Sequence, residues 1–521
     1  MPSNFSRRGF LASGGGGIGA VLLAACAGGS TSSATATSTA AAGTPKKGGL
    51  LRVGSIGATA DTMDAQHVTS DMDQQRNQNV YDSLRYLRPS LPYGYDNGLA
   101  ESIELNAAAT VATVRLQSGV EFHNGKSLTA EDLIFTMQRM LNPSAPGGAA
   151  ASFAAVNPKD ITKVDNLTVQ FNLSKPDSMF AERWGSAQTS ILPVGFNPAK
   201  PVGTGPFKVQ SFTPGSRSVF VRNPNYWLSG EPYLDEVDII DFTDNTSRIA
   251  ALLSGQVDAV DSVDPSDLSQ IPSSGYTKMI TKSGFYQPIT MRVDLAPFND
   301  VRVRQAMRYI VNRPQMIAQA YSGYATVAND MPFPSDPAYP HYPQRVQDID
   351  MAKSLLKAAG HENLAITFTT AAENGGMVAM AQVFAQQASA AGVKVTVNDI
   401  TPTAFDAGFQ SWPFTNNYWA ANVMGTGYSG RFLRGSGLND SRWNNPTATA
   451  LYNDLLKTTD QAKQNTYASK IFEIFYNEGP DVIHTFKDNI DVFSSKFSGF
   501  VPFVANGWSL GSWRYRNVWV S

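Results

Sequence analysis

The chain has 521 residues, of which 42% are hydrophobic and 16% charged, and its formal net charge at pH 7 is −2. This composition is typical of a folded globular protein, and the length is enough for two or three domains. The near-neutral charge argues against a nucleic-acid-binding protein, which needs a basic surface. A single cysteine excludes an intramolecular disulfide.

That cysteine, Cys26, follows an N-terminal export signal. Arg7 and Arg8 precede an uncharged stretch, residues 9–25, that is too short and too glycine-rich to span a bilayer. The paired arginines favour the twin-arginine export route. Residues 23–26, LAAC, resemble the lipobox of bacterial lipoproteins, in which the cysteine carries the lipid. We expect Cys26 to be lipidated; the alternative is an ordinary cysteine in a signal cleaved elsewhere.

The segment after Cys26 predicts a flexible tether. Residues 27–44 carry no charge and no bulky side chain, so they cannot bury enough apolar surface to fold. A chain of this length reaches roughly 20–25 Å. We therefore assign residues 1–26 to the signal and residues 27–47 to a tether. The folded body is expected outside the cytoplasm, in the periplasmic space or at the outer face of the cell membrane.

The first part of the folded body alternates strands and helices. Residues 49–55 predict a strand, residues 80–87 have the spacing of a helix, and residues 111–116 and 167–173 predict two further strands. Between these two strands, Thr129 and Asp132 form a capping-box-like pair at the start of an amphipathic helix.

The later segments continue this alternation. Residues 202–212 predict a glycine- and proline-containing turn before a strand, and residues 233–260 predict a strand, a helix that ends at Gly255, and a short strand. Residues 364–400 predict strand, helix and strand again. Further helices are expected at residues 298–313, 350–361 and 448–477. The pattern indicates a mixed α/β protein without internal repeats.

The motifs, in their order along the chain, resemble the extracytoplasmic solute-binding proteins of ABC importers, in the oligopeptide/nickel-binding family (family 5). Each motif is weak alone, but together they are specific and cover nearly all of the chain beyond the tether. They are GGLLRVG (48–54), VYDSL (80–84), VRLQSGVEFHNGKSLTAEDLIFTMQRM (114–140), VGTGPF (202–207), VRNPNYWLSGEPYLDEVDI (221–239), RIAALLSGQVDAV (248–260) and APFNDVRVRQAMRYIVNR (296–313).

The resemblance implies a two-lobe α/β fold of the periplasmic-binding-protein type (type II, flytrap), with an extra subdomain. It implies that lobe I is discontinuous, built from residues 48–82, 200–283 and 490–521, with residues 83–199 as its subdomain. It also implies that residues 284–489 form lobe II, and that a ligand is enclosed when the lobes close.

The function implied by the resemblance is a membrane-tethered receptor of an ABC importer, not an enzyme. The receptor would capture a peptide or other small oligomeric solute and deliver it to the permease subunits, without a cofactor and without nucleic acid. The class of ligand stays open between oligopeptides, oligosaccharides and metal or haem chelates. The alternative is a secreted, lipid-anchored hydrolase with an unrecognised active site.

Three patterns that look catalytic do not carry chemistry. The glycines at residues 14–19 satisfy G-x-G-x-x-G but lie in the signal, with no strand before them. Residues 507–511, GWSLG, satisfy G-x-S-x-G around Ser509, but no histidine follows the serine as an α/β-hydrolase requires. The five histidines are far apart in the sequence, so they predict no metal site.

Three ligand-contact segments carry over by position from the peptide-binding members of the family. The first follows the first strand, the second lies at the strand-to-helix turn of residues 371–374 in lobe II, and the third is at residues 422–425. The candidate ligand-binding residues in them are Thr69, Ser70, Asp71 and Met72, then Glu373 and Asn374, then Asn422, Met424 and Gly425.

Two charged groups expected in peptide-binding members are missing here. Those proteins pair the ligand's ammonium with an aspartate in the third segment, and dipeptide-binding members pair its carboxylate with an arginine in the second. This chain has Gly425 and small neutral residues there. A buried ligand charge without a partner costs several kcal/mol. Short zwitterionic peptides are therefore disfavoured, unless Asp71 or Glu373 takes the ammonium.

The third segment is preceded by aromatic and amide side chains. Tyr418 and Trp419 are candidates for ligand contact, with packing inside a buried strand as the alternative. Tyr286, at the crossing into lobe II, is a similar candidate. Aromatic faces beside amides suit sugars, flat uncharged ligands or extended peptides.

Overall fold

The computed structural model describes residues 43–57, 61–68 and 70–521. Cys26, the signal, most of the tether and Thr69 lie outside the described residues. The described part belongs to one compact unit, residues 40–521. It is a mixed α/β structure whose described sheets have seven, five and four strands, with three further sheets of two strands each, and the predicted fold class is confirmed. None of the described helices is long and apolar enough to cross a membrane.

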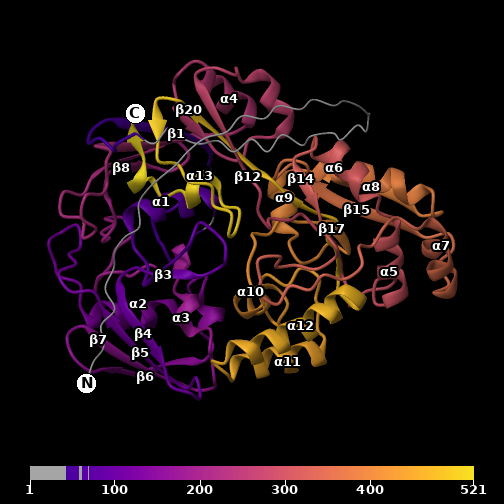
Figure 1. Cartoon of the computed structure of the whole chain (residues 1–521), viewed down its shortest axis with the longest axis horizontal. Helices are drawn as coiled ribbons and strands as arrows, with labels where there is room; N and C mark the ends of the chain where they lie inside the picture. The colour runs from indigo at the N-terminus through magenta and orange to yellow at the C-terminus, as the bar shows by residue number, and fades with distance from the viewer. Residues whose placement is uncertain (1–42, 58–60, 69) are drawn as a thin grey trace, which may run out of the picture. The chain divides into compact units, whose positions relative to one another are not determined.

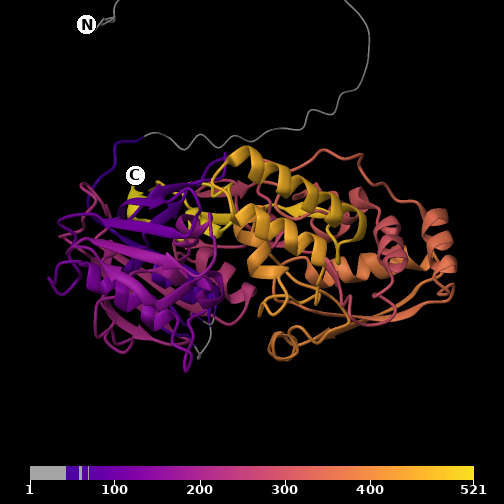
Figure 2. The ribbon, with the colours of Figure 1, turned by 90° about the horizontal axis from the view of Figure 1, so that it is seen from below.

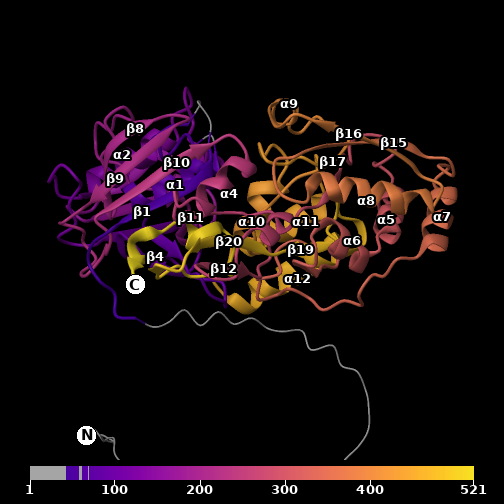
Figure 3. The same ribbon diagram turned by 90° about the horizontal axis from the view of Figure 1, so that it is seen from above.

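Lobe I is built on a seven-stranded sheet in the order β12-β20-β11-β1-β10-β9-β8. The central strand β1 pairs in parallel with both β10 and β11, and its residues Leu51 and Val53 are fully buried. Figure 3 shows β8, β9, β10, β1 and β11 across this lobe. The strands are β1 Leu50–Ile56, β8 Phe207–Thr213, β9 Arg217–Arg222, β10 Glu236–Phe242, β11 Ala259–Val260, β12 Tyr276–Thr281 and β20 Asn489–Ser494.

Short helices and hairpins complete lobe I. The helix α4 packs on β1 and β11, and Ser70 caps α1 by accepting a hydrogen bond from the backbone N–H of Asp73. The elements are α1 Asp71–Val80, α4 Asn245–Leu253, α13 Ser509–Ser512, the 3₁₀ helices Pro265–Gln270 and Tyr515–Asn517, and the hairpin of β21 Phe497–Ser498 with β22 Trp519–Val520.

A subdomain is inserted between β1 and β8. Its four-stranded antiparallel sheet, in the order β4-β5-β7-β6, packs against α2 around a buried Trp184. As predicted, Thr129 begins α2, and its backbone N–H donates to Asp132 Oδ2 at 3.0 Å. The elements are β2 Arg85–Leu87, β3 Tyr95–Asn97, β4 Ala100–Leu105, β5 Val111–Leu116, α2 Ala130–Met140, β6 Val156–Lys163, β7 Thr168–Leu173, α3 Phe180–Arg183 and the 3₁₀ helices Ala150–Phe153 and Ala187–Thr189.

Lobe II is built on a five-stranded sheet in the order β16-β15-β17-β13-β18. The helix α8 packs on β15 and β16, and the helices α5 and α7 pack against each other. Figures 1 and 2 show these orange segments apart from the indigo and magenta segments of lobe I. The elements are β13 Ile289–Met291, α5 Val301–Ile310, α6 Arg313–Ala320, α7 Ile349–Ala358, β15 Ala365–Ala371, α8 Met377–Ser389, β16 Lys394–Ile400, β17 Phe414–Asn416 and β18 Asp481–Val482.

A second core of lobe II lies under its later helices. The helices α11 and α12 pack together over α10, around Tyr428, Phe432 and Phe475. The remaining elements are β14 Ala325–Val327 paired with β19 Thr485–Lys487, α9 Pro402–Ala407, α10 Met424–Arg431, α11 Pro446–Leu456 and α12 Gln461–Glu478.

Two predicted helices are wrong in their extent. The helix expected at residues 80–87 is absent, because α1 ends at Val80 and residues 85–87 form β2. The closely packed Gly203 and Gly205 lie against the Val80 backbone, so the chain there is fixed by contacts from far away in the sequence. The helix expected at residues 448–477 is two helices, because Asp460 starts α12 by accepting hydrogen bonds from Ala462 and Lys463.

The domain boundaries predicted from the sequence stay a prediction. We use the name lobe I for the seven-stranded sheet with its subdomain, and lobe II for the five-stranded sheet with its helices.

Candidate functional site

Two short segments connect the lobes side by side. The first, residues 282–288, leads from β12 in lobe I to β13 in lobe II, and the second returns through Asp488 from β19 to β20. The Lys487 backbone N–H donates to the Phe285 carbonyl at 2.7 Å, which joins the two segments. Because the chain passes only here between the two large sheets, these segments are where a change of angle between the lobes would be absorbed.

A small cavity of about 20 Å³ lies beside these connections, and we call it the hinge cavity. Residues from both lobes line it just beyond the carboxyl ends of strands, where open α/β sheets bind ligands. Ser262 follows β11 of lobe I, and Asn374 follows β15 of lobe II. The lining residues are Asp71, Ser262, Phe285, Asn374, Lys487, Asp488, Asn489, Gly507, Trp508, Ser509 and Trp513.

Carboxylates from both lobes repel one another around the hinge cavity. Asp71 is exposed to solvent, yet desolvation by the surrounding protein and the charge of Asp261 raise its pKa to about 6. Burial, Asp406 and Asp71 raise the pKa of Glu373 to about 7. Asp71, burial and Glu373 also raise the pKa of the Tyr418 hydroxyl. Asp71 of lobe I thus acts on Glu373 and Tyr418 of lobe II, so negative charges of both lobes lie near one another.

Few positive charges balance these carboxylates. Among the described residues, Asp71, Glu373 and Asp406 take part in no ion pair within 4.0 Å. Lys487 is the cation that lines the hinge cavity, and burial lowers its pKa to about 8. It donates to Asn374 Oδ1 at 2.7 Å. The site is therefore acidic, and it favours a ligand with a positively charged group.

Aromatic rings line the hinge cavity or stack on its lining residues. Phe285 and Tyr418 stack with centroids 6.2 Å apart and an interplanar angle of 21°. Trp508 and Trp513 lie 5.0 Å apart, and the Trp513 indole N–H donates to Asp261 Oδ2 at 3.3 Å. Aromatic faces hold both apolar and cationic groups, so this surface suits an organic cation.

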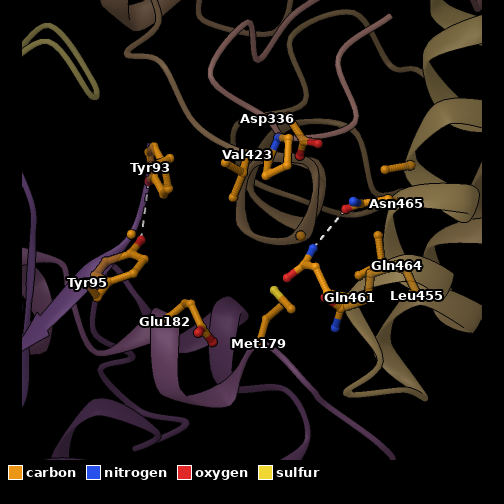
Figure 4. A pocket seen from close by; sticks show the side chains of 14 residues that line it. Tyr93, Tyr95, Met179, Glu182, Asp336, Val423, Leu455, Gln461, Gln464 and Asn465 are labelled. Carbon is orange, nitrogen blue, oxygen red and sulfur yellow. Dashed lines mark hydrogen bonds between the residues drawn. The ribbon is translucent and has the colours of Figure 1, made fainter. Parts of the chain in front are cut away.

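A second cavity, which we call the side cavity, lies between the subdomain and lobe II (Figure 4). Its volume is about 150 Å³. Figure 4 shows Tyr93, Tyr95 and Glu182 on one side, and Asp336, Gln461 and Asn465 on the other. The lining residues are Tyr93, Gly94, Tyr95, Met179, Glu182, Asp336, Pro337, Val423, Gly425, Leu455, Gln461, Gln464, Asn465 and Ala468.

Direct contacts close the subdomain against lobe II beside this cavity. The Ser178 backbone N–H donates to the Leu456 carbonyl at 3.0 Å, and its hydroxyl accepts a hydrogen bond from Gln464 at 3.1 Å. The Tyr93 hydroxyl donates to Asn422 Oδ1 at 3.3 Å. The described structure is thus one in which the two lobes touch.

Five of the predicted ligand-binding residues lie at these cavities or in the acidic group. Asp71 and Asn374 line the hinge cavity, and Gly425 lines the side cavity. Glu373 and Tyr418 belong to the interacting carboxylates and rings described above. Their contact with a ligand stays a prediction.

Four further predicted residues have structural partners. Ser70 caps α1, and the side chains of Met72 and Met424 are buried in the cores of lobe I and lobe II. The hydroxyl of the buried Tyr286 accepts a hydrogen bond from Arg431 at 3.3 Å. We leave these four out of the ligand set proposed below.

Trp419 and Asn422 line neither cavity, but both contact other side chains. The guanidinium of Arg431 lies 4.6 Å from the Trp419 ring, which is half-buried. Asn422 accepts hydrogen bonds from Tyr93 and, at 3.4 Å, from Thr426. Asn422 therefore joins lobe II to the subdomain at the edge of the side cavity.

Sequence reasoning missed the contribution of the C-terminal segment to the hinge cavity. The GWSLG pattern draws attention to Ser509 as a nucleophile, whereas its hydroxyl bonds to Ser262 Oγ at 2.8 Å and accepts from Asn489 at 3.1 Å. The signal in that pattern that could have pointed to the hinge cavity is Trp508, an aromatic residue next to small residues. Among the described residues, no group of three His, Cys, Asp or Glu side chains is arranged to hold a metal ion.

Comparisons with known proteins agree with this architecture. The family model "Bacterial extracellular solute-binding proteins, family 5 Middle" matches residues 94–438. The chain is 26% identical over 486 residues to the glutathione-binding protein GsiB of Pectobacterium atrosepticum, covering 86% of this chain and 90% of the relative. It is 27% identical over 433 residues to heme-binding protein A of Haemophilus influenzae, covering 73% and 77%.

Solved structures share the fold. The PBP AgaA in complex with agropinic acid from A. tumefaciens R10 superposes with a TM-score of 0.81 at 21% identity, covering 91% of this chain and 99% of that chain. The periplasmic binding protein DppA from Helicobacter pylori, in complex with the peptide STSA, gives a TM-score of 0.78 at 22% identity, covering 91% and 98%.

Proposed function

The chain belongs to the bacterial extracellular solute-binding proteins of family 5, and from that premise we propose that it is the receptor of an ABC importer for a solute with a cationic group. Proteins of this family are transport receptors, not enzymes, and they work outside the cytoplasm. The solute we propose is a peptide or another small molecule that carries an ammonium or guanidinium group. The importer's permease subunits would receive it from the closed receptor.

The observation that carries this proposal is the unpaired acidic group at the junction of the lobes. Asp71 comes from lobe I, whereas Glu373 and Asp406 come from lobe II, and the charge of Asp71 raises the pKa of the Glu373 carboxyl and of the Tyr418 hydroxyl across the junction. Bringing these like charges together is unfavourable without a counter-ion. A bound cation removes that cost in the closed state only, which gives the ligand the differential affinity that drives closure.

Two further observations support a peptide-like amine. Relatives and similar structures include a glutathione-binding protein and binding proteins in complex with the peptide STSA and with Met-Leu. Lys487 is the single lysine among the lining residues of the hinge cavity, and no arginine lines it. We therefore propose that the ligand's cationic end is recognised more strongly than a carboxylate end.

Calorimetric titration of residues 45–521, refolded to remove carried ligand, tests this function. The tripeptide amide Ala-Ala-Ala-NH₂ should bind, and its N-acetylated form, which lacks the ammonium, should bind at least about 10-fold more weakly. Asp71→Asn and Glu373→Gln should reduce this preference, whereas Asp399→Asn, on an exposed strand of lobe II, should not. Equal affinity for the two peptides, or tight binding of maltotriose instead, would contradict the cationic ligand.

We also propose that Cys26 anchors the protein to the membrane and that Arg7 and Arg8 direct it to twin-arginine export. The support is the order of motifs in the sequence: paired arginines, a short apolar stretch and LAAC. Cys26→Ser should move the protein from the membrane fraction to the soluble extracytoplasmic fraction. Replacing both arginines with lysine should leave it in the cytoplasm. Unchanged export of that double variant would favour the general secretion route.

A further inference from the structure

The side cavity has an acidic lining without a cation. None of the fourteen residues that line it is lysine, arginine or histidine, whereas Glu182 and Asp336 are both acidic. Glu182 lies in α3 of the subdomain, and Asp336 lies in lobe II between β14 and α7. A group bound here would therefore touch one carboxylate from each lobe.

Glu182 has an unused acceptor. Its Oε2 is buried and has no hydrogen-bond partner among the described residues. The neighbouring Arg183 is engaged with Asp177 at 2.6 Å. Arg85 attracts the charge of Glu182 without an ion pair within 4.0 Å; its Nη2 donates to the Tyr95 carbonyl at 3.0 Å, and its buried Nε has no hydrogen-bond partner among the described residues. A buried carboxylate oxygen without a donor is costly, so this oxygen points to a missing partner.

Asp336 offers the opposite acceptor. Its carboxylate accepts the backbone N–H of Met424 at 2.7 Å and that of Ala338 at 2.8 Å, and burial raises its pKa. These neutral donors hold the carboxylate in place, and no cation among the described residues pairs with it within 4.0 Å. Its charge is therefore available to a ligand.

The size and the walls of the side cavity define the ligand group. A cavity of about 150 Å³ holds a group the size of benzene. Met179, Val423 and Leu455 provide apolar walls, and the Tyr95 hydroxyl, which lies 3.3 Å from that of Tyr93, provides a polar one. An alkylammonium group such as a lysine side chain matches this combination, with methylenes against the walls and the charge between the carboxylates.

The two cavities are close enough for one small ligand. Tyr418, stacked on Phe285 of the hinge cavity, and Val423 of the side cavity are separated by five residues of chain. A chain of five residues spans at most about 18 Å. A peptide of a few residues covers that distance.

We propose that the side cavity is a second cation subsite, so that the receptor selects solutes with two positively charged groups. Glu182 and Asp336 hold the second group, a primary ammonium on a short aliphatic chain. This inference rests on the proposed function, in which the first cationic group lies at Asp71 and Glu373.

Matched peptides test this subsite. Calorimetry on residues 45–521, which lie within the compact unit, compares Ala-Ala-Lys-NH₂ with Ala-Ala-norleucine-NH₂, which lacks only the side-chain ammonium. The lysine peptide should bind roughly 10-fold or more tightly than the norleucine peptide. Glu182→Gln should abolish that preference. Glu101→Gln, on the exposed surface of the subdomain, is the matched control.

A second variant keeps the test informative if Glu182→Gln destabilises the subdomain. Asn465→Trp fills the side cavity from α12 and should remove the preference for the lysine peptide over the norleucine peptide. If both peptides bind with equal affinity and Asp71→Asn weakens both, the second subsite is refuted and the proposed function stands. If neither peptide binds the wild-type protein, the proposed function and this inference both fail.

Discussion

Removing the Glu373 carboxyl should stabilise the ligand-free protein, and more so at alkaline pH. Burial and the charges of Asp406 and Asp71 raise the pKa of Glu373 from its usual 4.5 to about 7. A carboxyl whose pKa is higher in the folded than in the unfolded state favours folding when protonated. This contribution to the free energy of unfolding is complete below the pKa of the unfolded state, 4.5. It is lost as the pH rises through the pKa of the folded state, about 7. Glutamine keeps the shape of the side chain and does not titrate.

The size of the effect follows from the pKa. A displacement from 4.5 to about 7 corresponds to roughly 3 kcal/mol when the carboxyl is fully ionised. Glu373 keeps some contact with solvent, which screens the charges and reduces this to about 1–2 kcal/mol. Glu373→Gln should thus raise the melting temperature at pH 8 by about 1–2 °C, because a compact unit of this length has an unfolding entropy of about 1 kcal/mol/K. The gain at pH 5 should be roughly a quarter of that, because the native carboxyl is then protonated.

Differential scanning calorimetry of residues 45–521 at low ionic strength, at pH 5 and pH 8, measures both gains. The matched control is Glu362→Gln, because Glu362 is an exposed glutamate of lobe II that lies 3.6 Å from Lys357. An equal melting temperature for the two variants at pH 8, or a larger gain at pH 5 than at pH 8, would refute the reasoning. It would mean that the acidic group is already neutralised in the empty protein.

Two further predictions concern the scaffold and the closed state. Asp330→Asn should lower the free energy of unfolding by about 3–5 kcal/mol, because it leaves the buried Arg313 and Arg345 without their shared carboxylate. Urea titrations measure this loss, and a loss below about 1 kcal/mol would contradict the prediction. Gly425→Val should separate the lobes, because a Cβ at Gly425 would lie 2.3 Å from the Met179 sulfur across the interface. A larger radius of gyration in solution scattering and an affinity about 10-fold lower should follow, and added Met179→Ala should restore both.

Local sequence patterns predicted the elements whose causes are local. The α2 cap depends on Thr129 and Asp132, three residues apart, and the strand β1 on a short apolar run. Both predictions are confirmed, because a cap and a periodicity involve only neighbouring residues. The predicted helix at residues 80–87 is wrong for the opposite reason. There the backbone of Leu84 accepts hydrogen bonds from Gly98 and Ala100 instead of from the next turn of a helix.

The sequence by itself determined the family, the two-lobe α/β fold and the candidate positions Asp71 and Glu373. It also determined that the third segment carries Gly425 and no aspartate. Only the tertiary structure decided the charge of the site and the use of the side cavity. A carboxyl pKa depends on burial and on distances to other charges. Asp71 and Glu373 lie on different lobes, and Glu182 faces lobe II only because the subdomain closes against α11 and α12. No periodicity along the chain encodes those distances.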